Sequence, residues 1–376
     1  MSTDKVNLID LMNVACPALT HPDKAVFKPS KWLFNGHLQT AAMTKMDSIK
    51  GYEVDYSREI VALPDGGTIA LDWFPSLEVN PDPNLPIIFI MHGLTGGSHE
   101  FYVRSFVKTI TDTRHGCRVI VLNNRGCGFS EIVTPKLYSA GHTDDLRFVL
   151  QRVRDQFPLT TPLIGVGFSL GSNILVKFAG EEGDRCVLKA AVSVSNPFNV
   201  LKTSELLHAG FWSSRTYARV MRNEIIGLFN RHRHMFKDPE SDATIDFDFD
   251  PDSVARCKNV REFDDLFTRR MFGYASVQDY YRSAGCAPYV GRVRIPLLCV
   301  HSLDDPVCLA QSIPLQAIRN NPYVVLATTA AGGHLGWLAA GSGGHRVRPW
   351  LVDPVSEFCM AMAQVEAVDS PETCLL

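Results

Sequence analysis

The sequence predicts an α/β fold with a mostly parallel, twisted sheet, helices on both of its faces and a helical cap insertion. Two observations lead to this prediction. Short apolar runs of strand length alternate with segments of helical periodicity over most of the chain, which is typical of a parallel sheet covered by helices. The alternation stops between about residues 197 and 292, so this stretch is expected to cap the sheet edge where open α/β sheets bind ligands.

Eight runs are expected to be strands. Two of them flank the turn PDGG and predict a hairpin, whereas the others are continuous apolar runs, as expected of strands buried on both faces. The predicted strands are 59–63, 68–74, 85–91, 117–123, 162–168, 188–194, 295–301 and 323–329. Helices are expected at 100–112, 142–156 and 170–180, with a helix pair within 210–236 followed by an acidic run at 238–252.

Composition and the two ends of the sequence limit the class of protein that we expect. We expect an N-terminal extension at 1–50, one large domain at 51–366 that contains the cap, and a tail at 367–376. A net charge of −3 gives no basic field for nucleic acid. The first residues lack the basic region and apolar core of a signal peptide. Ten cysteines without a C-x-x-C pair favour a reduced intracellular protein, so a cytoplasmic location is expected, with peripheral membrane or lipid-droplet contact as an open alternative.

A candidate nucleophile lies in the pentapeptide Gly167-Phe168-Ser169-Leu170-Gly171. This G-x-S-x-G motif follows a predicted strand and precedes a predicted helix. In such an elbow the serine occupies a strained turn, and small residues are needed two positions away because the strand and helix backbones crowd there. The alternative interpretation is a serine that caps the helix N-terminus.

A serine hydroxyl needs a base, and in this arrangement the chain order is serine, acid, histidine. The loop after the strand at 295–301 offers Asp304 and Asp305, and the loop after the strand at 323–329 offers His334. We predict Asp305 as the acid and His334 as the base. Asp304 stays open as the alternative acid, or as a residue that binds backbone amides.

Two other histidines are rivals for the base. His345 lies eleven residues beyond His334, past the end of the strand, and His301 falls on a predicted strand. Both are interpreted as structural.

The Gly-rich segment MHGLTGG at 91–97 predicts an oxyanion hole. The backbone amides of Leu94 and Leu170 are the expected donors to a tetrahedral intermediate, and His92 is expected to support the loop. No G-K-[ST] triplet follows, so a nucleotide phosphate loop is excluded. No cofactor and no metal are predicted, because the acidic run lacks the glycine and glutamate of a calcium loop.

These motifs occur together and in order. They include NGHLQT (35–40), HGLTGGS (92–98), the stretch 123–146, GFSLGSN (167–173), REFDDLFT (261–268), YASVQDYYRSA (274–284), DDP (304–306) and GGHLG (332–336). The set resembles the YheT-like branch of α/β-hydrolases, which includes fungal medium-chain fatty-acid ethyl ester synthase/esterases and animal lipid-acting proteins. The resemblance spans about residues 30–365 and implies a serine esterase or acyl transferase that uses Ser169, Asp305 and His334.

The predicted activity is hydrolysis of carboxylic esters, with medium-chain acyl groups and transfer to an alcohol such as ethanol as finer expectations. Acylglycerol or phospholipid hydrolysis, thioester or peptide hydrolysis on the same triad, and a catalytically silent scaffold are the alternatives. Five cap residues are expected either to line the acyl site or to pack in the cap core: Phe211, Trp212, Met221, Leu228 and Phe229. Arg125 and Tyr138 are expected to make buried structural contacts or to line the pocket.

Overall fold

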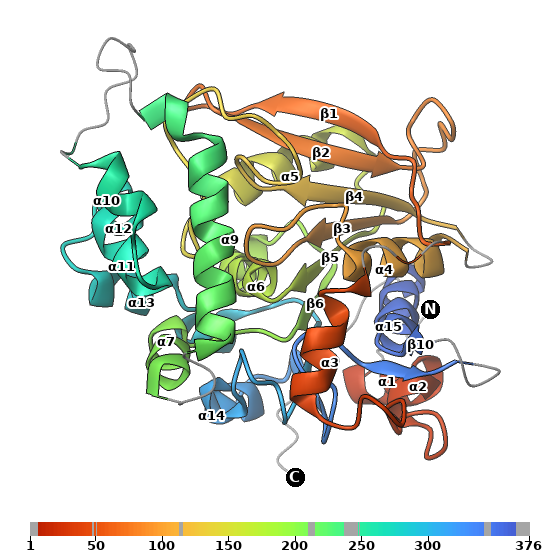
Figure 1. The fold of residues 1–376 in the computed structure, drawn as a ribbon. Helices are drawn as coiled ribbons and strands as arrows, with labels where there is room; N and C mark the ends of the chain where they lie inside the picture. The colour runs from red at the N-terminus through yellow and green to blue at the C-terminus, as the bar shows by residue number, and fades with distance from the viewer. Residues whose placement is uncertain are drawn as a thin grey trace.

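An eight-stranded sheet forms the centre of the molecule (Figure 1). The computed structural model describes residues 7–46, 49, 51–112, 116–209, 215–236, 247, 249–341 and 347–365. The strand order is β1-β2-β4-β3-β5-β6-β7-β8. The bounds are β1 Ser57–Ala62, β2 Thr68–Phe74, β3 Ile87–Met91, β4 Arg118–Asn123, β5 Leu163–Phe168, β6 Ala190–Val194, β7 Leu297–Ser302 and β8 Val324–Thr329. Each predicted strand is confirmed to within a few residues.

Strand direction also agrees with the prediction. β2 pairs antiparallel with β1 and with β4, and the pairs from β4 through β8 are all parallel. The predicted hairpin is therefore present, with Ser57 opposite Trp73. The parallel strands end at one edge of the sheet, which is where their following loops meet.

Helices cover both faces of the sheet, because the buried strands present apolar side chains to each side. Along β3, Ile88 and Ile90 pack with α4 (Phe101–Thr111), α15 (Val352–Gln364) and α1 (Leu8–Ala15). The alternate residues Phe89 and Met91 pack with α5 (Asp144–Gln156) and α6 (Leu170–Glu182) on the other face. The predicted helices at 100–112, 142–156 and 170–180 are thus confirmed.

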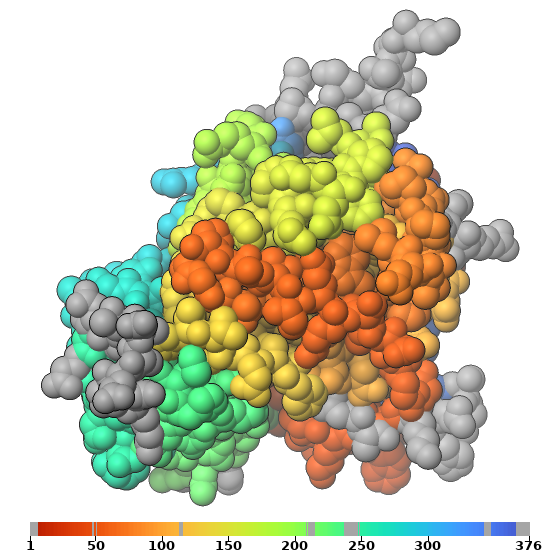
Figure 2. All heavy atoms as spheres, turned by 90° about the horizontal axis from the view of Figure 1, so that it is seen from above, coloured from red at the N-terminus to blue at the C-terminus, as the bar shows by residue number. Residues whose placement is uncertain are grey.

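The cap follows β6 and returns to the sheet at β7. Its elements are α7 Val200–Ala209, α9 Tyr217–Arg231, the 3₁₀ turn η3 Arg233–Phe236, α10 Pro251–Ala255, α11 Val260–Phe263, the π-helical turn η4 Asp264–Thr268, α12 Arg269–Met271 and α13 Val277–Ala284. Of the predicted helix pair at 210–236, the structure describes α9 and the turn η3, whereas residues 210–214 lie outside the described residues, so the pair itself stays a prediction. Figure 2 shows the cap gathered at one corner of the molecule, in green and teal. Most of the acidic run at 238–252 lies outside the described residues.

The N-terminal segment folds against the C-terminal part of the domain. Helix α3 (Gly36–Met43) is bound to β9 (Leu338–Ala340), since the Gln39 amide donates to the Leu338 carbonyl at 3.2 Å and accepts from the Leu338 N–H at 2.8 Å. The remaining elements are α2 Pro17–Thr20, η2 Gly183–Arg185, η5 Ala287–Arg292, η6 Ala310–Ser312, α14 Leu315–Arg319 and β10 Val347–Pro349. The division of the chain at residues 50 and 366 stays a prediction.

Within the described ranges, no helix combines the length and the apolar character that crossing a bilayer requires.

Candidate active site

Ser169 occupies a strained turn between β5 and α6. Its backbone has φ 50° and ψ −118°, a region that non-glycine residues rarely adopt and that costs energy. A Cβ added at Gly167 would lie 2.4 Å from the Cα of Ser172, and one at Gly171 would lie 2.4 Å from the carbonyl oxygen of His92. No side chain fits at either position, so the two glycines are what allow the turn.

The three predicted side chains meet at this turn. Nε2 of His334 lies 2.9 Å from Oγ of Ser169, and Nδ1 of His334 lies 2.8 Å from Oδ2 of Asp305. An ionised carboxylate only accepts hydrogen bonds. Nδ1–H therefore donates to Asp305, and Nε2 is left to accept from the serine hydroxyl.

The neighbouring aspartates have different partners. Oδ1 of Asp305 accepts from the amides of Val307 and Cys308, both at 2.8 Å, and the residue is 2% exposed. Asp304 accepts instead from the amide of Gly333 at 2.9 Å and from the Ser302 hydroxyl at 2.6 Å. The structure thus puts Asp305 on the imidazole and Asp304 on backbone amide and hydroxyl donors.

The structure describes one of the two rival histidines, His301, and its hydrogen-bond partner is not the serine. His301 lies on β7 and is fully buried, with its Nε2 at 2.7 Å from the carbonyl of Cys308. Burial lowers the pKa of His301. His345 lies outside the described residues.

The predicted oxyanion loop is close to the serine. A Cβ built on Gly93 would lie 3.3 Å from the Cβ of Ser169, and both Leu94 and Leu170 line the same cavity as Ser169. Leu170 is the first residue of α6, where backbone N–H groups have no partner within the helix. Two backbone amides at this place are the donors that a developing oxyanion needs, and their role as the oxyanion hole stays a prediction.

Two tyrosines hold this loop, and sequence reasoning assigned neither of them that role. The Tyr138 hydroxyl accepts from the amide of Thr95 at 2.7 Å, and the Tyr102 hydroxyl accepts from the amide of Gly93 at 2.9 Å. Thr95 has φ 56°, so the loop is strained beside Leu94. Tyr138 is part of the LYSAGHTDDL stretch, and this motif was the one sequence feature that could have pointed to its role in holding the loop.

His92 supports the loop from below, as the sequence indicated. Nδ1 lies 2.7 Å from the carbonyl of Gly93, and Nε2 accepts from the amide of Asn124 at 3.1 Å. Burial lowers the pKa of His92 to about 4. The ring is therefore neutral at ordinary pH and joins two loops without acting as a base.

A cavity opens directly above Ser169, between the sheet edge and the cap. Its wall is mostly apolar and comes from the start of α6, from α7, α9, the α11–α12 segment and α13, and from the loops that hold Leu94, residues 137–140, Pro197 and residues 307–308. Apolar lining residues include Leu137, Leu207, Met221, Ile225, Leu228, Phe263, Phe267, Met271 and Val307. Such a wall suits an aliphatic group placed next to the serine.

The cap residues expected at the acyl site fall into two groups: some line the cavity, and one packs in the cap core. Met221 and Leu228 line the cavity. Phe229 does not: it is fully buried in the cap core, with ring centroids 5.3 Å from Phe236 and 5.2 Å from Phe267. The reason is helical geometry, because successive residues of α9 point to different sides of the helix. Phe211 and Trp212 lie outside the described residues.

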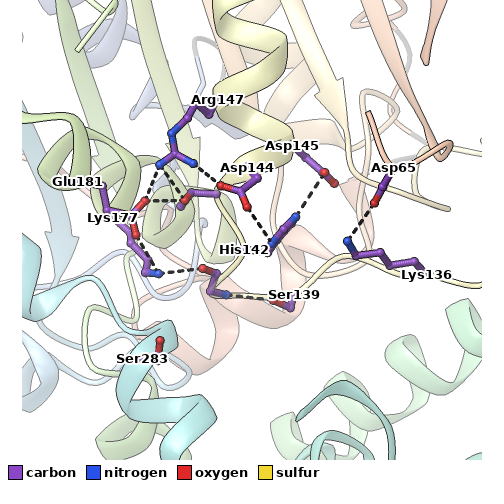
Figure 3. A network of polar contacts seen from close by, with 12 residues as sticks. Asp65, Lys136, Ser139, His142, Asp144, Asp145, Arg147, Lys177, Glu181 and Ser283 are labelled. Atoms are coloured by element: carbon purple, nitrogen blue, oxygen red, sulfur yellow. Dashed lines mark hydrogen bonds and ion pairs between the residues drawn. The ribbon is translucent and has the colours of Figure 1, made fainter. Parts of the chain in front are cut away.

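The loop that carries Tyr138 is fixed by a network of ion pairs. Arg125 is buried and pairs with Asp145 at 2.6 Å and with Asp65 at 2.9 Å, which makes it the structural ion pair that was one of its two expected roles. Burial would raise the pKa of Asp145, but Arg125 and His142 hold it well below its usual range. Figure 3 shows further pairs of the network, among them Lys136–Asp65, His142–Asp145 and Lys177–Glu181.

The comparisons with known proteins agree with this geometry. Residues 86–335 match a family model described as the alpha/beta hydrolase fold. The chain belongs to the α/β-hydrolase family. A monoacylglycerol lipase of Saccharomyces cerevisiae is 32% identical over 403 residues, which cover 95% of this chain and 86% of that protein.

Two further relatives place this α/β-hydrolase in the YheT-like branch. The phospholipase ABHD3 of Homo sapiens is 33% identical over 86% of this chain and 75% of its own length. The medium-chain fatty acid ethyl ester synthase/esterase 2 of Saccharomyces cerevisiae is 29% identical over 94% of this chain and 89% of its own length. The resemblance read from the motifs is confirmed, and the relatives support a carboxylic ester hydrolase.

Helix α3 of this α/β-hydrolase supports the histidine, which the sequence did not reveal. The His334 amide donates to Oγ1 of Thr40 at 2.8 Å, and Thr40 donates to the carbonyl of Gly36 at 2.7 Å. A Cβ added at Gly36 would lie 2.0 Å from the carbonyl oxygen of Asp304. The NGHLQT motif therefore positions the loops that carry the acid and the base.

Cys308 completes the surroundings of the triad. Its thiol contacts the Ser169 hydroxyl, and burial raises the pKa of Cys308 well above its usual value. Asp305, Cys308 and His334 are the one group of ligand type in the described residues whose atoms lie within 4.8 Å of one another. Both ring nitrogens of His334 are already engaged, by Ser169 at 2.9 Å and by Asp305 at 2.8 Å, so these residues fit an acid–base pair beside a serine better than a metal centre.

Proposed function

We propose that this α/β-hydrolase cleaves esters of medium-chain acyl groups through a covalent acyl-enzyme on Ser169. The observation that carries the proposal is the unbroken chain of contacts from Ser169 through His334 to Asp305 at the base of an apolar cavity. The serine is exposed to the cavity by its strained turn, and the base is already within hydrogen-bond distance of it.

In the proposed reaction the Ser169 oxygen attacks the ester carbonyl while its proton passes to Nε2 of His334. The amides of Leu94 and Leu170 bind the oxyanion that forms. Asp305 holds Nδ1–H and stabilises the imidazolium. Collapse of the intermediate breaks the ester bond, and His334 returns the proton to the departing alcohol. Water then attacks the acyl-enzyme by the same steps and releases the acid.

The cavity supports an aliphatic acyl group as the part of the substrate that is recognised. Met221, Ile225 and Leu228 of α9 line the same cavity as Ser169, together with Phe263 and Phe267. Burying one methylene contributes about 0.8 kcal/mol, so affinity should rise with acyl length until the cavity is filled. The name of the yeast ethyl ester synthase/esterase relative agrees with a medium-length chain.

Acyl transfer to an alcohol such as ethanol is the second candidate. The acyl-enzyme reacts with whichever nucleophile reaches it, and the apolar lining around Ser169 disfavours water in the cavity. The same yeast relative, named both a synthase and an esterase, agrees with both outcomes. Under this proposal the alcohol enters the cavity and takes the place of water in the second half of the reaction.

We also propose that the protein takes its substrate from an anionic lipid surface. Between Lys24 and Phe34 the chain has three lysines and no acid. Trp32 is 85% exposed and Phe34 is 66% exposed, and exposed aromatic side chains next to lysines are typical of surfaces that bind at a bilayer interface. This patch, residues 24–34, leads directly into α3, whose Gly36 lies against Asp304.

The test is turnover of a chain-length series of p-nitrophenyl esters, with and without ethanol. We expect a maximum at medium length, ethyl ester as a product when ethanol is present, and no turnover by Ser169→Ala despite an unchanged fold. A fluorophosphonate probe should label the native protein and not this variant. Full activity of Ser169→Ala would exclude the acyl-enzyme. The absence of both turnover and labelling in the native protein would favour a silent scaffold, and parallel thioester and amide substrates distinguish the other hydrolase classes.

A further inference from the structure

The cavity above Ser169 contains one carboxylate that the proposed reaction does not use. Asp264 is the first residue of the π-helical turn η4, and it is 6% exposed. Its Oδ2 accepts from the Tyr281 hydroxyl at 2.8 Å, and the Thr268 side chain also forms a hydrogen bond to it. All three residues line the cavity. They form a polar cluster in a wall that is otherwise mostly apolar.

This carboxylate lacks a compensating cation. No lysine or arginine of the described chain forms an ion pair with Asp264, and the nearby Arg269 pairs with Asp265 instead. Burial raises the pKa of Asp264 to about 6, against the hydrogen bonds from Thr268 and Tyr281, which lower it. A buried carboxylate without a cation destabilises a fold. Perturbed groups of this kind in a cleft are concentrated at functional sites.

Asp264 has acceptor capacity left for a ligand. An ionised carboxylate offers about four acceptor positions, and the two side chains of the cluster occupy two of them. Because Asp264 lines the cavity, a bound molecule can reach the remaining acceptor positions of the carboxylate. The turn that holds it is π-helical. Such turns are rare in proteins overall, and those that do occur are often found at functional sites. A neutral hydrogen-bond donor suits this position, because the surrounding wall does not stabilise a full charge.

We propose that Asp264, held by Tyr281 and Thr268, binds a hydroxyl group of the substrate, so that hydroxylated acyl esters are the preferred substrate class. This inference rests on the proposed ester hydrolysis and refines it. The hydroxyl has two chemical sources: the alcohol portion of the ester, as in a monoacylglycerol, or a hydroxylated acyl chain. Both present the same O–H donor at a distance from the ester, and the experiment below separates them.

The experiment compares substrates in pairs on the full-length protein. Monodecanoylglycerol and ethyl ω-hydroxydecanoate are each compared with ethyl decanoate, and the ratio of kcat/KM within each pair is measured. For Asp264→Leu we expect one of the two ratios to fall about tenfold or more, because a hydrogen bond to a charged group is lost. Asp264→Asn keeps an acceptor oxygen and should lose less. The matched control is Asp265→Asn, which alters the adjacent, partly exposed carboxylate and should leave both ratios unchanged.

The outcome identifies the source of the hydroxyl. A fall for monodecanoylglycerol alone assigns it to the alcohol portion, and a fall for the hydroxyacyl ester alone assigns it to the acyl chain. If Asp264→Leu changes all three substrates by the same factor, or none of them, the subsite does not exist and Asp264 is a structural anchor for Tyr281. If Asp264→Leu does not fold, the same kcat/KM ratios are measured for Asp264→Asn and Tyr281→Phe, and these ratios then test the subsite.

Failure of the proposed function gives a different result. In that case the native protein turns over none of the three esters, and it does not react with a fluorophosphonate probe. A protein that hydrolyses all three esters with ratios insensitive to Asp264 keeps the proposed function and loses only the subsite.

Discussion

Asp304 and Asp305 are adjacent in the chain, and their carboxylates hold two adjacent residues of the histidine loop. Oδ1 of Asp304 accepts from the Gly333 amide at 2.9 Å, and Oδ2 of Asp305 accepts from Nδ1–H of His334 at 2.8 Å. One aspartate thus fixes the backbone of the loop and the other fixes the imidazole. The two residues are chemically identical, and only their contacts give them different roles.

This difference predicts the effects of a matched pair of variants. Asp305→Asn should lower kcat for a p-nitrophenyl ester by about 1,000-fold or more, because the amide no longer holds the required tautomer of His334. Asp304→Asn keeps an acceptor oxygen for Gly333 and should lower kcat less than about tenfold. Equal losses in the two variants would contradict the assignment of Asp305. Circular dichroism and the thermal midpoint of each variant check that the fold is intact.

Tyr138→Phe should lower kcat by roughly tenfold with little change in KM. Loss of the hydroxyl leaves the Thr95 amide without its acceptor, which loosens the neighbouring Leu94 amide, and poorly positioned oxyanion donors mainly reduce transition-state stabilisation. Steady-state kinetics with a p-nitrophenyl ester measure both constants. Tyr280→Phe is the control, since that hydroxyl accepts from the Ala140 amide at 3.0 Å and not from the oxyanion loop. A Tyr138→Phe variant with native kcat would rule out this positioning role.

His92 should make the protein sensitive to acid. Its pKa is about 4 in the fold, because of burial, and 6.5 without that environment. The unfolded chain therefore binds the proton first as the pH falls. The stability contributed by the neutral ring is complete above pH 6.5 and is lost progressively toward pH 4, by up to a few kcal/mol.

The measurement is the thermal midpoint of the native protein and of His92→Gln at several pH values across this window. Glutamine keeps a donor and an acceptor but does not titrate. We expect the gap in midpoint between native protein and variant to shrink as the pH falls. Parallel curves would show that some other group causes the acid sensitivity.

The surface patch at residues 24–34 predicts lipid binding. The double variant Trp32→Glu with Phe34→Glu should weaken co-sedimentation with phosphatidylserine-containing vesicles by about tenfold or more, through lost interfacial burial and added repulsion. Binding should also fall with rising salt. Turnover of a soluble ester serves as the control for an intact active site. Vesicle binding that is insensitive to both the variant and salt would reject this surface.

Most of the architecture could be predicted from the sequence, because strands and elbows depend on local chemistry. Continuous apolar runs gave β3 through β8, and the alternation of Ile88 and Phe89 between two cores follows from the pleat of a strand. The requirement for Gly167 and Gly171 is also local, since a Cβ at either position meets backbone atoms at 2.4 Å. The candidate acid and His334 could also be predicted, because each lies in the loop that directly follows a predicted strand.

Other features depend on residues that are distant in sequence. Whether Phe229 faces the cavity or the cap core depended on how α9 packs against Phe236 and Phe267. The supporting contact from Thr40 to His334 joins residues 294 positions apart, and no local pattern encodes such a partner.

The sequence by itself determined the fold class, the sharp turn at residue 169 and the short set of side chains able to serve it. Those depend on backbone sterics and on the periodicity of apolar residues, which act over a few neighbouring positions. The tertiary structure decided which aspartate contacts the imidazole, which tyrosines hold the oxyanion loop and where a carboxylate enters the cavity. These outcomes depend on how surfaces far apart in the chain pack together, because hydrogen bonds are made at about 3 Å and a short change in position replaces one partner with another.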